Sequence, residues 1–216
     1  MSGREEVLVL PKRLFDGHHA FLDWQFIEDI MEELEATHRW WERTYAEESS
    51  DWVQPIACAV VTDSAGLHYV FRRVKNTRDD LKGRVTMVIG GHVEPHAESA
   101  SLCELLLATL LREMEEEVGI ADLVDAKPLG VVIDNSTILS SRHVGFVYEV
   151  VWNLPVVATA TDEFSRRSQL NGHLATKEEL TTFHSQLDPW SRLIFEDRIR
   201  PEIRKLPRQR AFSLDI

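Results

Sequence analysis

Residues 110–120 have the sequence LLREMEEEVGI, in which four glutamates stand between an arginine and a glycine. A run of like charges most often forms the solvated face of a helix. Their spacing distinguishes three of the four glutamates from the other. Glu116 and Glu117 lie three and four positions after Glu113, so these three share one side of a helix. Like charges at these spacings destabilise a bare helix by roughly a few tenths of a kcal/mol per pair. Mg²⁺ or Mn²⁺, which prefer carboxylate oxygens, would remove that repulsion, whereas Glu115 points elsewhere.

The surrounding sequence predicts a helix from about Leu102 to Val118. Ser101 and Glu104 fit a capping box at its start, and Gly119 stands in the position that commonly closes a helix. The apolar residues expected to form its buried stripe are Cys103, Leu107, Leu110, Leu111, Met114 and Val118.

Residues 112–120 fit the order Arg-Glu-apolar-any-Glu-Glu-any-Gly-apolar at every position. This order resembles the Nudix box, the signature of hydrolases that act on a nucleoside diphosphate linked to another moiety. The family's box begins with Gly, five residues, Glu and seven residues before the Arg–Glu pair, and Glu104 stands seven residues before Arg112. Twelve residues separate Glu104 from Gly91, so the loop 92–101 makes the box about seven residues longer than usual. Glu98 lies closer to the usual spacing from Gly91 but too far from Arg112, so we take Glu104 as the match.

Together with Gly90-Gly91 and an N-terminal extension, the long loop resembles the predicted-phosphoesterase branch of the Nudix hydrolases. The resemblance implies a set of metal ligands for Mg²⁺ or Mn²⁺: Glu113, Glu116, Glu117 and the Gly90 carbonyl. It also implies that Arg112 belongs to the catalytic group and holds a carboxylate in place by a bidentate contact. Glu104 would brace the loop, Gly119 would close the helix, and Gly90 and Gly91 would allow close approach of the backbone. The implied reaction is attack of water on one phosphorus of a diphosphate.

The general base stays open. A glutamate of the box can serve, and the acids outside the box that come into question are Asp134, Glu149, Asp162 and Glu163. Asp134 is equally typical of an aspartate that starts a turn before Asn135 and Ser136. His92 directly follows the two glycines and is a candidate for a phosphate contact or proton transfer, although a loop histidine is more often a surface residue. Trp40, Trp41 and Trp52 could stack on a nucleobase, but core packing is the more typical role at their spacing.

The rest of the chain mixes strands and helices without strict alternation, which predicts an α+β protein, an α/β/α sandwich with a mixed sheet flanked by helices. Strands are expected at 5–11, on both sides of a turn at 63–66, at 84–95, at 127–134 and at 142–152. Further helices are expected at 26–47, 174–187 and 189–199. We expect a strand–helix extension at 1–50 that packs on the core, a Nudix hydrolase domain at 51–200 and a C-terminal tail at 201–216.

The 216 residues carry a formal charge of −12, which argues against a general nucleic-acid surface and leaves a small phosphorylated substrate as the expected partner. Two buried free thiols are expected, Cys58 and Cys103. No segment predicts a signal peptide or a membrane span, so we expect a cytoplasmic protein. Dimers are common on this fold, which leaves a homodimer open. The first alternative to a hydrolase is a nucleotide-binding regulatory protein of the same fold, against which the intact box argues. The second alternative is isopentenyl diphosphate isomerase. That enzyme needs a particular cysteine-bearing motif, and this sequence has none in a matching place. The specific substrate is left open.

Overall fold

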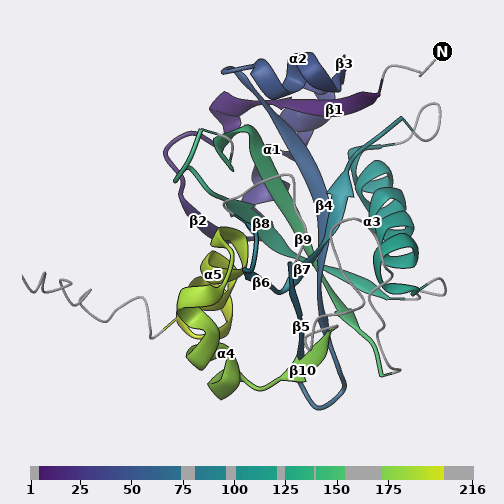
Figure 1. The fold of residues 1–216 in the computed structure, drawn as a ribbon. Coiled ribbons are helices and arrows are strands. Elements are labelled where there is room, and N and C mark those ends of the chain that lie inside the picture. The colour runs from purple at the N-terminus through teal and green to yellow at the C-terminus, as the bar shows by residue number, and fades with distance from the viewer. Residues whose placement is uncertain are drawn as a thin grey trace, which may run out of the picture.

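The structure, a computed structural model, describes residues 5–73, 81–95, 101–120, 125–138, 140–153 and 172–201. Its main sheet (Figure 1) contains, in order across the sheet, β10 (His173–Ala175), β5 (His68–Arg72), β4 (Trp52–Thr62), β9 (His143–Val151), β8 (Ala126–Ile133) and β2 (Ala20–Asp23). Four further strands pair beside this path: β1 (Glu6–Pro11) with β4 and with β3 (Arg39–Glu42), β6 (Val85–Thr86) with β5, and β7 (Val88–His92) with β4. The β4–β9 pair is parallel and the β4–β7 and β8–β9 pairs are antiparallel, so the sheet is mixed.

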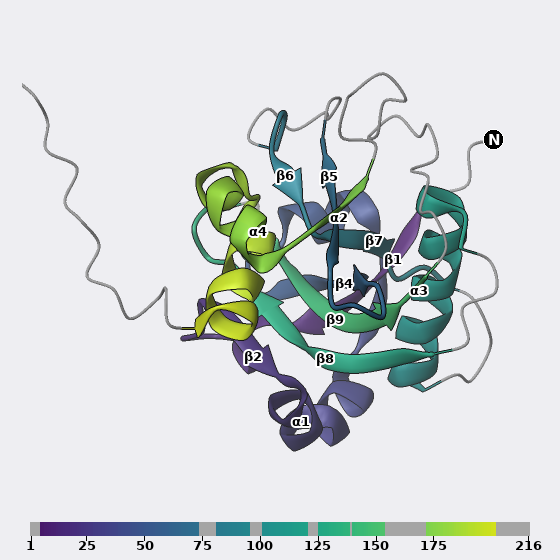
Figure 2. The same ribbon diagram turned by 90° about the horizontal axis from the view of Figure 1, so that it is seen from below.

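Helices cover both faces of this sheet. The α-helices are α1 (Trp24–Thr37), α2 (Arg43–Glu48), α3 (Leu102–Val118), α4 (Lys177–Phe183) and α5 (Pro189–Ile194), and α5 continues into a π-helical turn at Phe195–Ile199. Three short 3-10 turns lie at Lys12–Leu14, Ser140–Arg142 and His184–Gln186. Figure 2 shows α3 and the α4–α5 pair on opposite sides of the central strands.

Alternation along β4 explains the two layers, because neighbouring side chains of a strand point to opposite faces. Ala57, Ala59 and Val61 belong to the core that includes α1 and α3. Ile56, Cys58 and Val60 belong to the core on the other face, with Leu193 and Ile194 of α5. The expected α+β sandwich with a mixed sheet is confirmed.

The single helix expected at 26–47 is wrong at residues 38–42, and the chain is helical again only in α2, from Arg43. His38 has an extended backbone (φ −58°, ψ 153°), and the next four residues form β3 instead of continuing the helix. They pair with β1, so that Trp40 lies opposite Leu8 and Trp41 opposite Val7. The helical spacing of the tryptophans is therefore overridden by pairing with a strand that is distant in sequence.

The buried stripe expected on α3 is only partly correct. Leu110, Met114 and Val118 are buried, but Cys103, Leu107 and Leu111 are exposed. The helix buries a neighbouring set in their place: Leu102, Leu105, Leu106 and Thr109. Leucines occur around most of this helix, so the sequence leaves its rotation ambiguous, and packing against β4 and β7 decides it. The expected burial of both thiols is right for Cys58 and wrong for Cys103.

Smaller differences concern two strands. The strand expected at 84–95 is divided into β6 and β7, because Thr86 bends the chain and exchanges hydrogen bonds with Val88. The helix expected from 174 begins only at Lys177, after β10 has paired with β5.

The N-terminal residues contribute to the sheet itself. β2 pairs with β8, β1 pairs with β4, and the four residues Val7 to Leu10 are fully buried. The tail expected at 201–216 lies outside the described residues except for Pro201. Within the described parts of the chain, none of the helices has the length and apolar character needed to cross a bilayer.

Candidate active site

The start of α3, the helix that carries the box, is fixed by side chains. The Glu104 carboxylate accepts hydrogen bonds from the Ser101 backbone N–H and hydroxyl, both at 2.8 Å, and the Ser101 hydroxyl accepts from the Glu104 N–H at 3.3 Å. This is the capping box expected from the sequence. The two bonds from Ser101, the backbone one first, hold the pKa of Glu104 below its usual range. Glu35 of α1 accepts from the Leu102 N–H at 2.7 Å.

The end of α3 is fixed by Gly119. Its backbone is left-handed (φ 70°, ψ 23°), a conformation that favours glycine. The N–H groups of Gly119 and Ile120 donate to the carbonyls of Glu115 and Met114, both at 3.0 Å. Local contacts therefore fix both ends of α3, and this also fixes the position of each box residue along the helix.

Gly90 and Gly91 of β7 stand where no side chain fits. A Cβ on Gly90 would lie 2.1 Å from the Ala57 carbonyl oxygen of the neighbouring strand. A Cβ on Gly91 would lie 2.1 Å from Oε1 of Glu113. The second glycine thus makes room for a buried carboxylate from α3.

Arg112 connects α3 to the end of β7. Its Nη2 lies 2.7 Å from Oε1 of Glu113, and its Nη1 lies 3.1 Å from Oε2 of Glu116. The Nη2 group also donates to the His92 carbonyl at 3.3 Å. The resemblance implied a bidentate contact to one carboxylate, whereas here one guanidinium joins two carboxylates and a backbone carbonyl.

Glu113 has the most perturbed electrostatics of the box. Only 9% of the residue is exposed, and this burial raises the pKa of its carboxyl. The nearby charges of Glu116 and Glu94 raise it further, whereas Arg112 opposes the change. Negative charge therefore accumulates here beyond what one arginine neutralises.

A cavity of about 580 Å³ brings most of the predicted site together. The residues expected from the sequence that line it are Gly90, Gly91, His92, Glu113, Glu117 and Asp134. Glu116 does not line it and turns to Arg112 with a side chain 56% exposed. Glu104 and Gly119 lie at the two ends of the helix, and Glu115 is exposed as expected. The course of the long loop and of Glu98 lies outside the described residues.

The donors at this cavity suit a hard divalent cation. Glu113, Glu117 and Glu94 bring carboxylates to the same cavity as the backbone of Gly90, and oxygen is the ligand that Mg²⁺ prefers. Among the described residues, no group of three or more His, Cys, Asp or Glu side chains is gathered closely enough to hold an ion. Arg112 instead pairs with Glu113 and Glu116. The residue types fit the metal, and the carboxylates are here arranged around an arginine.

Two histidines meet at the cavity wall. The Nε2 atoms of His92 and His143 lie 3.4 Å apart, and their rings meet edge to face at 72° with centroids 5.4 Å apart. The parallel and antiparallel partners of β4 bring them together, since β7 ends and β9 begins beside the same part of that strand.

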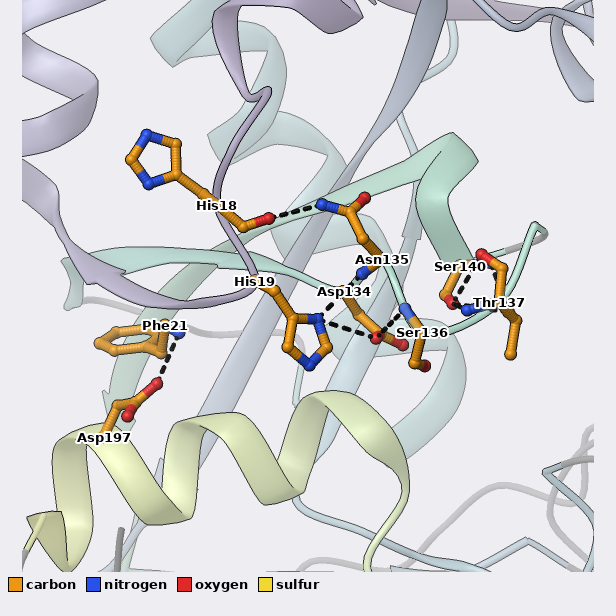
Figure 3. Close-up of polar contacts among 9 residues, drawn as sticks. All are labelled: His18, His19, Phe21, Asp134, Asn135, Ser136, Thr137, Ser140 and Asp197. Atoms are coloured by element: carbon orange, nitrogen blue, oxygen red, sulfur yellow. Dashed lines mark hydrogen bonds and ion pairs between the residues drawn. The ribbon is translucent and has the colours of Figure 1, made fainter. Parts of the chain in front are cut away.

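Asp134 follows β8 and is 1% exposed (Figure 3). Its Oδ1 accepts from the Ser136 N–H at 2.9 Å, which is the turn-starting role considered from the sequence. The same oxygen lies 3.4 Å from Nδ1 of His19, and that nitrogen accepts from the Asn135 N–H at 3.0 Å. The turn after β8 is thus held by the N-terminal segment through Asn135, whose N–H donates to His19 and whose side-chain amide donates to the His18 carbonyl, and Asp134 lines the cavity.

Several residues that line the cavity were not singled out from the sequence, among them Arg43, Glu47, Glu94, Asp188 and Trp190. Glu94 could have been found, because it follows the glycines by three positions. The others reach the cavity only through tertiary packing. The tryptophans considered for stacking do not line it: Trp41 and Trp52 pack with Val7, Val9 and Ala46, and Trp40 packs at the edge of the main core.

No family model matches the chain. The protein YmaB of Bacillus subtilis (strain 168) is 25% identical over 200 residues, which are 91% of this chain and 94% of YmaB. The crystal structure of Tm1382, a candidate Nudix hydrolase, superposes with a TM-score of 0.72 at 24% identity over 89% of this chain and 97% of that one. A bifunctional NMN adenylyltransferase/ADP ribose pyrophosphatase from Francisella tularensis, solved with AMP and a manganese ion, gives a TM-score of 0.50 at 13% identity over 74% of this chain and 44% of its own. The chain therefore has the Nudix hydrolase fold.

Proposed function

We propose that the chain is a Nudix hydrolase that depends on Mg²⁺ or Mn²⁺ and cleaves a phosphoanhydride bond in a nucleoside diphosphate-linked or related small molecule. One observation carries the proposal. The Glu113 carboxylate is buried against Gly91, is paired with Arg112, and lines one cavity with Glu117. A buried acid at a cavity, on a helix with the order of the Nudix box, has a clear use in this reaction and none in packing.

The metal would be held by Glu113, Glu116, Glu117 and the Gly90 carbonyl, and when bound it would lower the pKa of the attacking water and stabilise charge on the diphosphate. Arg112 fixes two of these carboxylates and the end of β7 relative to one another. Gly91 allows the carboxylate of Glu113 to approach the strand. The chain's own contribution is therefore to place oxygen donors where the diphosphate enters.

We assign proton transfer to His92, with His143 as its neighbour. A histidine is suited to this because its usual pKa lies near neutral pH. His92 lies next to Gly91 in the same strand, and its carbonyl accepts from Arg112. Asp134 lies among other polar groups of the cavity, and we assign it to substrate binding.

The test is a panel of diphosphate substrates with Mg²⁺ and with Mn²⁺, in which phosphate, AMP and pyrophosphate are measured separately. The wild-type protein is expected to turn over at least one substrate, and E116Q and E117Q are expected to lower the rate by about 100-fold or more. E115Q is the matched control, because Glu115 is a glutamate of the same helix that does not line the cavity and is not among the proposed ligands. Folded E116Q and E117Q variants with full activity would refute the proposal.

The alternative is a nucleotide-binding regulatory protein. It is favoured by one observation, that Arg112 already pairs with Glu113 and Glu116 in the described structure. The same panel separates the two functions. Tight binding of one ligand without turnover, with either metal, would indicate a regulator.

A further inference from the structure

Two aspartates of the cavity each have one occupied and one unoccupied carboxylate oxygen. Asp134 is 1% exposed and Asp188 is 3% exposed. Oδ1 of Asp134 accepts from the Ser136 N–H at 2.9 Å, and Oδ1 of Asp188 accepts from the Ser191 N–H at 2.8 Å. Over the described parts of the chain, Oδ2 of each is buried without a hydrogen-bond partner.

The described residues give no structural use for these two Oδ2 atoms. Asp134 starts a turn and Asp188 caps α5, and in each case Oδ1 alone makes the bond that the local structure needs. An asparagine would serve both turns equally well. Because a buried carboxylate oxygen without a donor is costly, two of them at one cavity indicate that a ligand supplies the donors.

The surroundings of the two aspartates also suit a ligand. Gln54 is fully buried, and neither its amide oxygen nor its amide nitrogen has a partner within the described residues. It lies two positions before Ile56, so it shares the face of β4 from which Ile56 lines the cavity. The Trp190 ring packs against Gly145, where a Cβ would lie 2.7 Å from Cζ3, and it gives the cavity an apolar side.

Charge at the cavity favours a ligand that donates hydrogen bonds. The carboxylates that line it are Glu47, Glu94, Glu113, Glu117, Asp134 and Asp188. Arg43 and Arg73 line it as well, and the Arg43 guanidinium pairs with Glu5 and Glu47. His19 lies beside the occupied oxygen of Asp134, not the free one (Figure 3). Among the described residues of the wall, six carboxylates therefore stand against two arginines.

We propose that Asp134 and Asp188 form a subsite for the part of the substrate that is linked to the diphosphate, and that this part carries O–H or N–H donors. The inference rests on the proposed function, which places the diphosphate beside Glu113 and Glu117. The substrate class is then a diphosphate of a hydroxyl- or amine-bearing group, and hydrocarbon diphosphates are excluded. A protonated amine satisfies both the bonding and the charge of the two carboxylates.

The test uses alkyl diphosphates whose chains of two to six carbons end in an amino, a hydroxyl or a methyl group. The length series removes the need to know how far the diphosphate lies from the aspartates. Binding affinity and kcat/KM are measured for each chain. At the best length, the amino or hydroxyl compound is expected to be preferred over the methyl compound by at least about tenfold. Equal values at every length, or preference for methyl, would overturn the subsite.

Variants of Asp134 and Asp188 test whether these aspartates cause the preference for amino and hydroxyl compounds over the methyl compound. D134N and D188N keep the oxygen that accepts from Ser136 or Ser191 and remove the charge. Each is expected to reduce the preference to within about threefold, through weaker binding of the amino and hydroxyl compounds. D63N is the control, because Asp63 also holds a turn, through the N–H groups of Ala65 and Leu67, but does not line the cavity. Urea unfolding verifies that each variant is folded, and an unchanged preference in folded D134N and D188N would refute the assignment.

The two proposals fail in different ways. If the wild type hydrolyses every compound alike and D134N and D188N change nothing, the subsite is wrong and the hydrolase stands. If the wild type turns over neither these compounds nor any substrate of the diphosphate panel but binds the amino compound in a manner that D134N weakens, the subsite stands and the hydrolase is wrong.

Discussion

Gly91 is the residue on which the buried carboxylate of the site depends. Because a Cβ there would lie 2.1 Å from Oε1 of Glu113, the substitution G91A must displace either the carboxylate or the strand. We expect at least about a tenfold loss of kcat/KM, since a small misplacement of a reacting group is costly. Overpacking should also lower the free energy of unfolding by about 1–3 kcal/mol. Steady-state kinetics and urea unfolding measure the two effects.

G66A is the control for that loss. Gly66 lies in the turn between β4 and β5 with a φ of 79° and open space around it. Alanine there should lower stability by about 1–2 kcal/mol through backbone strain, with activity per folded molecule unchanged. A G91A protein as active as G66A would contradict the role of Gly91.

Arg112 offers a second test at the residue scale. Lysine keeps the positive charge but lacks the planar fork that reaches Glu113, Glu116 and the His92 carbonyl together. R112K is expected to lower kcat/KM by about 10–100-fold, as is typical when the partner of a metal ligand is lost. R84K is the matched control, because Arg84 donates to the Ser185 carbonyl and does not line the cavity. Similar kinetics for the two variants would argue against the role of Arg112.

Part of the site could be predicted from the sequence because it lies on one helix. Spacing along a helix translates directly into position, so Arg112, Glu113 and Glu117 could be singled out by their order alone. Asp188 and Trp190 could not, because only the packing of α5 on the sheet brings them to the cavity. No local pattern distinguishes an aspartate that only caps a helix from one that also lines a cavity.

At the scale of the element, the N-terminal cap of α3 fixes the position of the box. S101A removes the hydroxyl that accepts from the Glu104 N–H and donates to its carboxylate. It is expected to lower the free energy of unfolding by about 1 kcal/mol, measured by urea titration. S101T keeps a hydroxyl and should recover most of this. Equal stability of S101A and the wild type would show that the cap is dispensable.

The same cap predicts a pH dependence. The bonds from Ser101 hold the pKa of Glu104 below its usual range, so the folded protein favours the ionised carboxylate. The resulting stability is present above the ordinary pKa of a glutamate and is lost as the pH falls through the lower pKa of the folded state. The difference in unfolding free energy between wild type and E104Q should therefore be larger at pH 7 than at pH 3. A difference that does not vary with pH would contradict this.

Helices and strands whose ends depend on neighbouring residues could be predicted from the sequence. Those that depend on pairing with a strand distant in the sequence could not. The bounds of α3 follow from Ser101 and Gly119, which act within one turn of the helix. The predicted helix at 26–47 fails because Trp40 and Trp41 pair with β1, some thirty positions earlier. Propensity and spacing carry no information about such a partner.

At the scale of the whole molecule, the N-terminal residues support the cavity. β2 pairs with β8 up to Ile133, directly before Asp134, and His19 lies against Asp134 itself. Arg43 and Glu47 of α2 line the cavity. The sequence suggested an extension at 1–50 that packs on the core. It could not indicate that this segment also contributes to the wall of the cavity, because that depends on where β2 and α2 join the rest of the fold.

Removal of residues 1–50 tests how far the rest of the chain depends on this segment. The truncation deletes β1, in which Val7, Leu8, Val9 and Leu10 are fully buried, and exposes their partners in the core. Burial of one such side chain stabilises a protein by about 1.5–3 kcal/mol, so the four together are comparable to a typical net stability of about 5–15 kcal/mol. We expect the fragment 51–216 to show no cooperative unfolding transition by circular dichroism, while H19A in the full chain unfolds cooperatively. A fragment that unfolds sharply and hydrolyses a diphosphate would show instead that the domain begins near residue 51, and that the N-terminal strands only cover an already complete site.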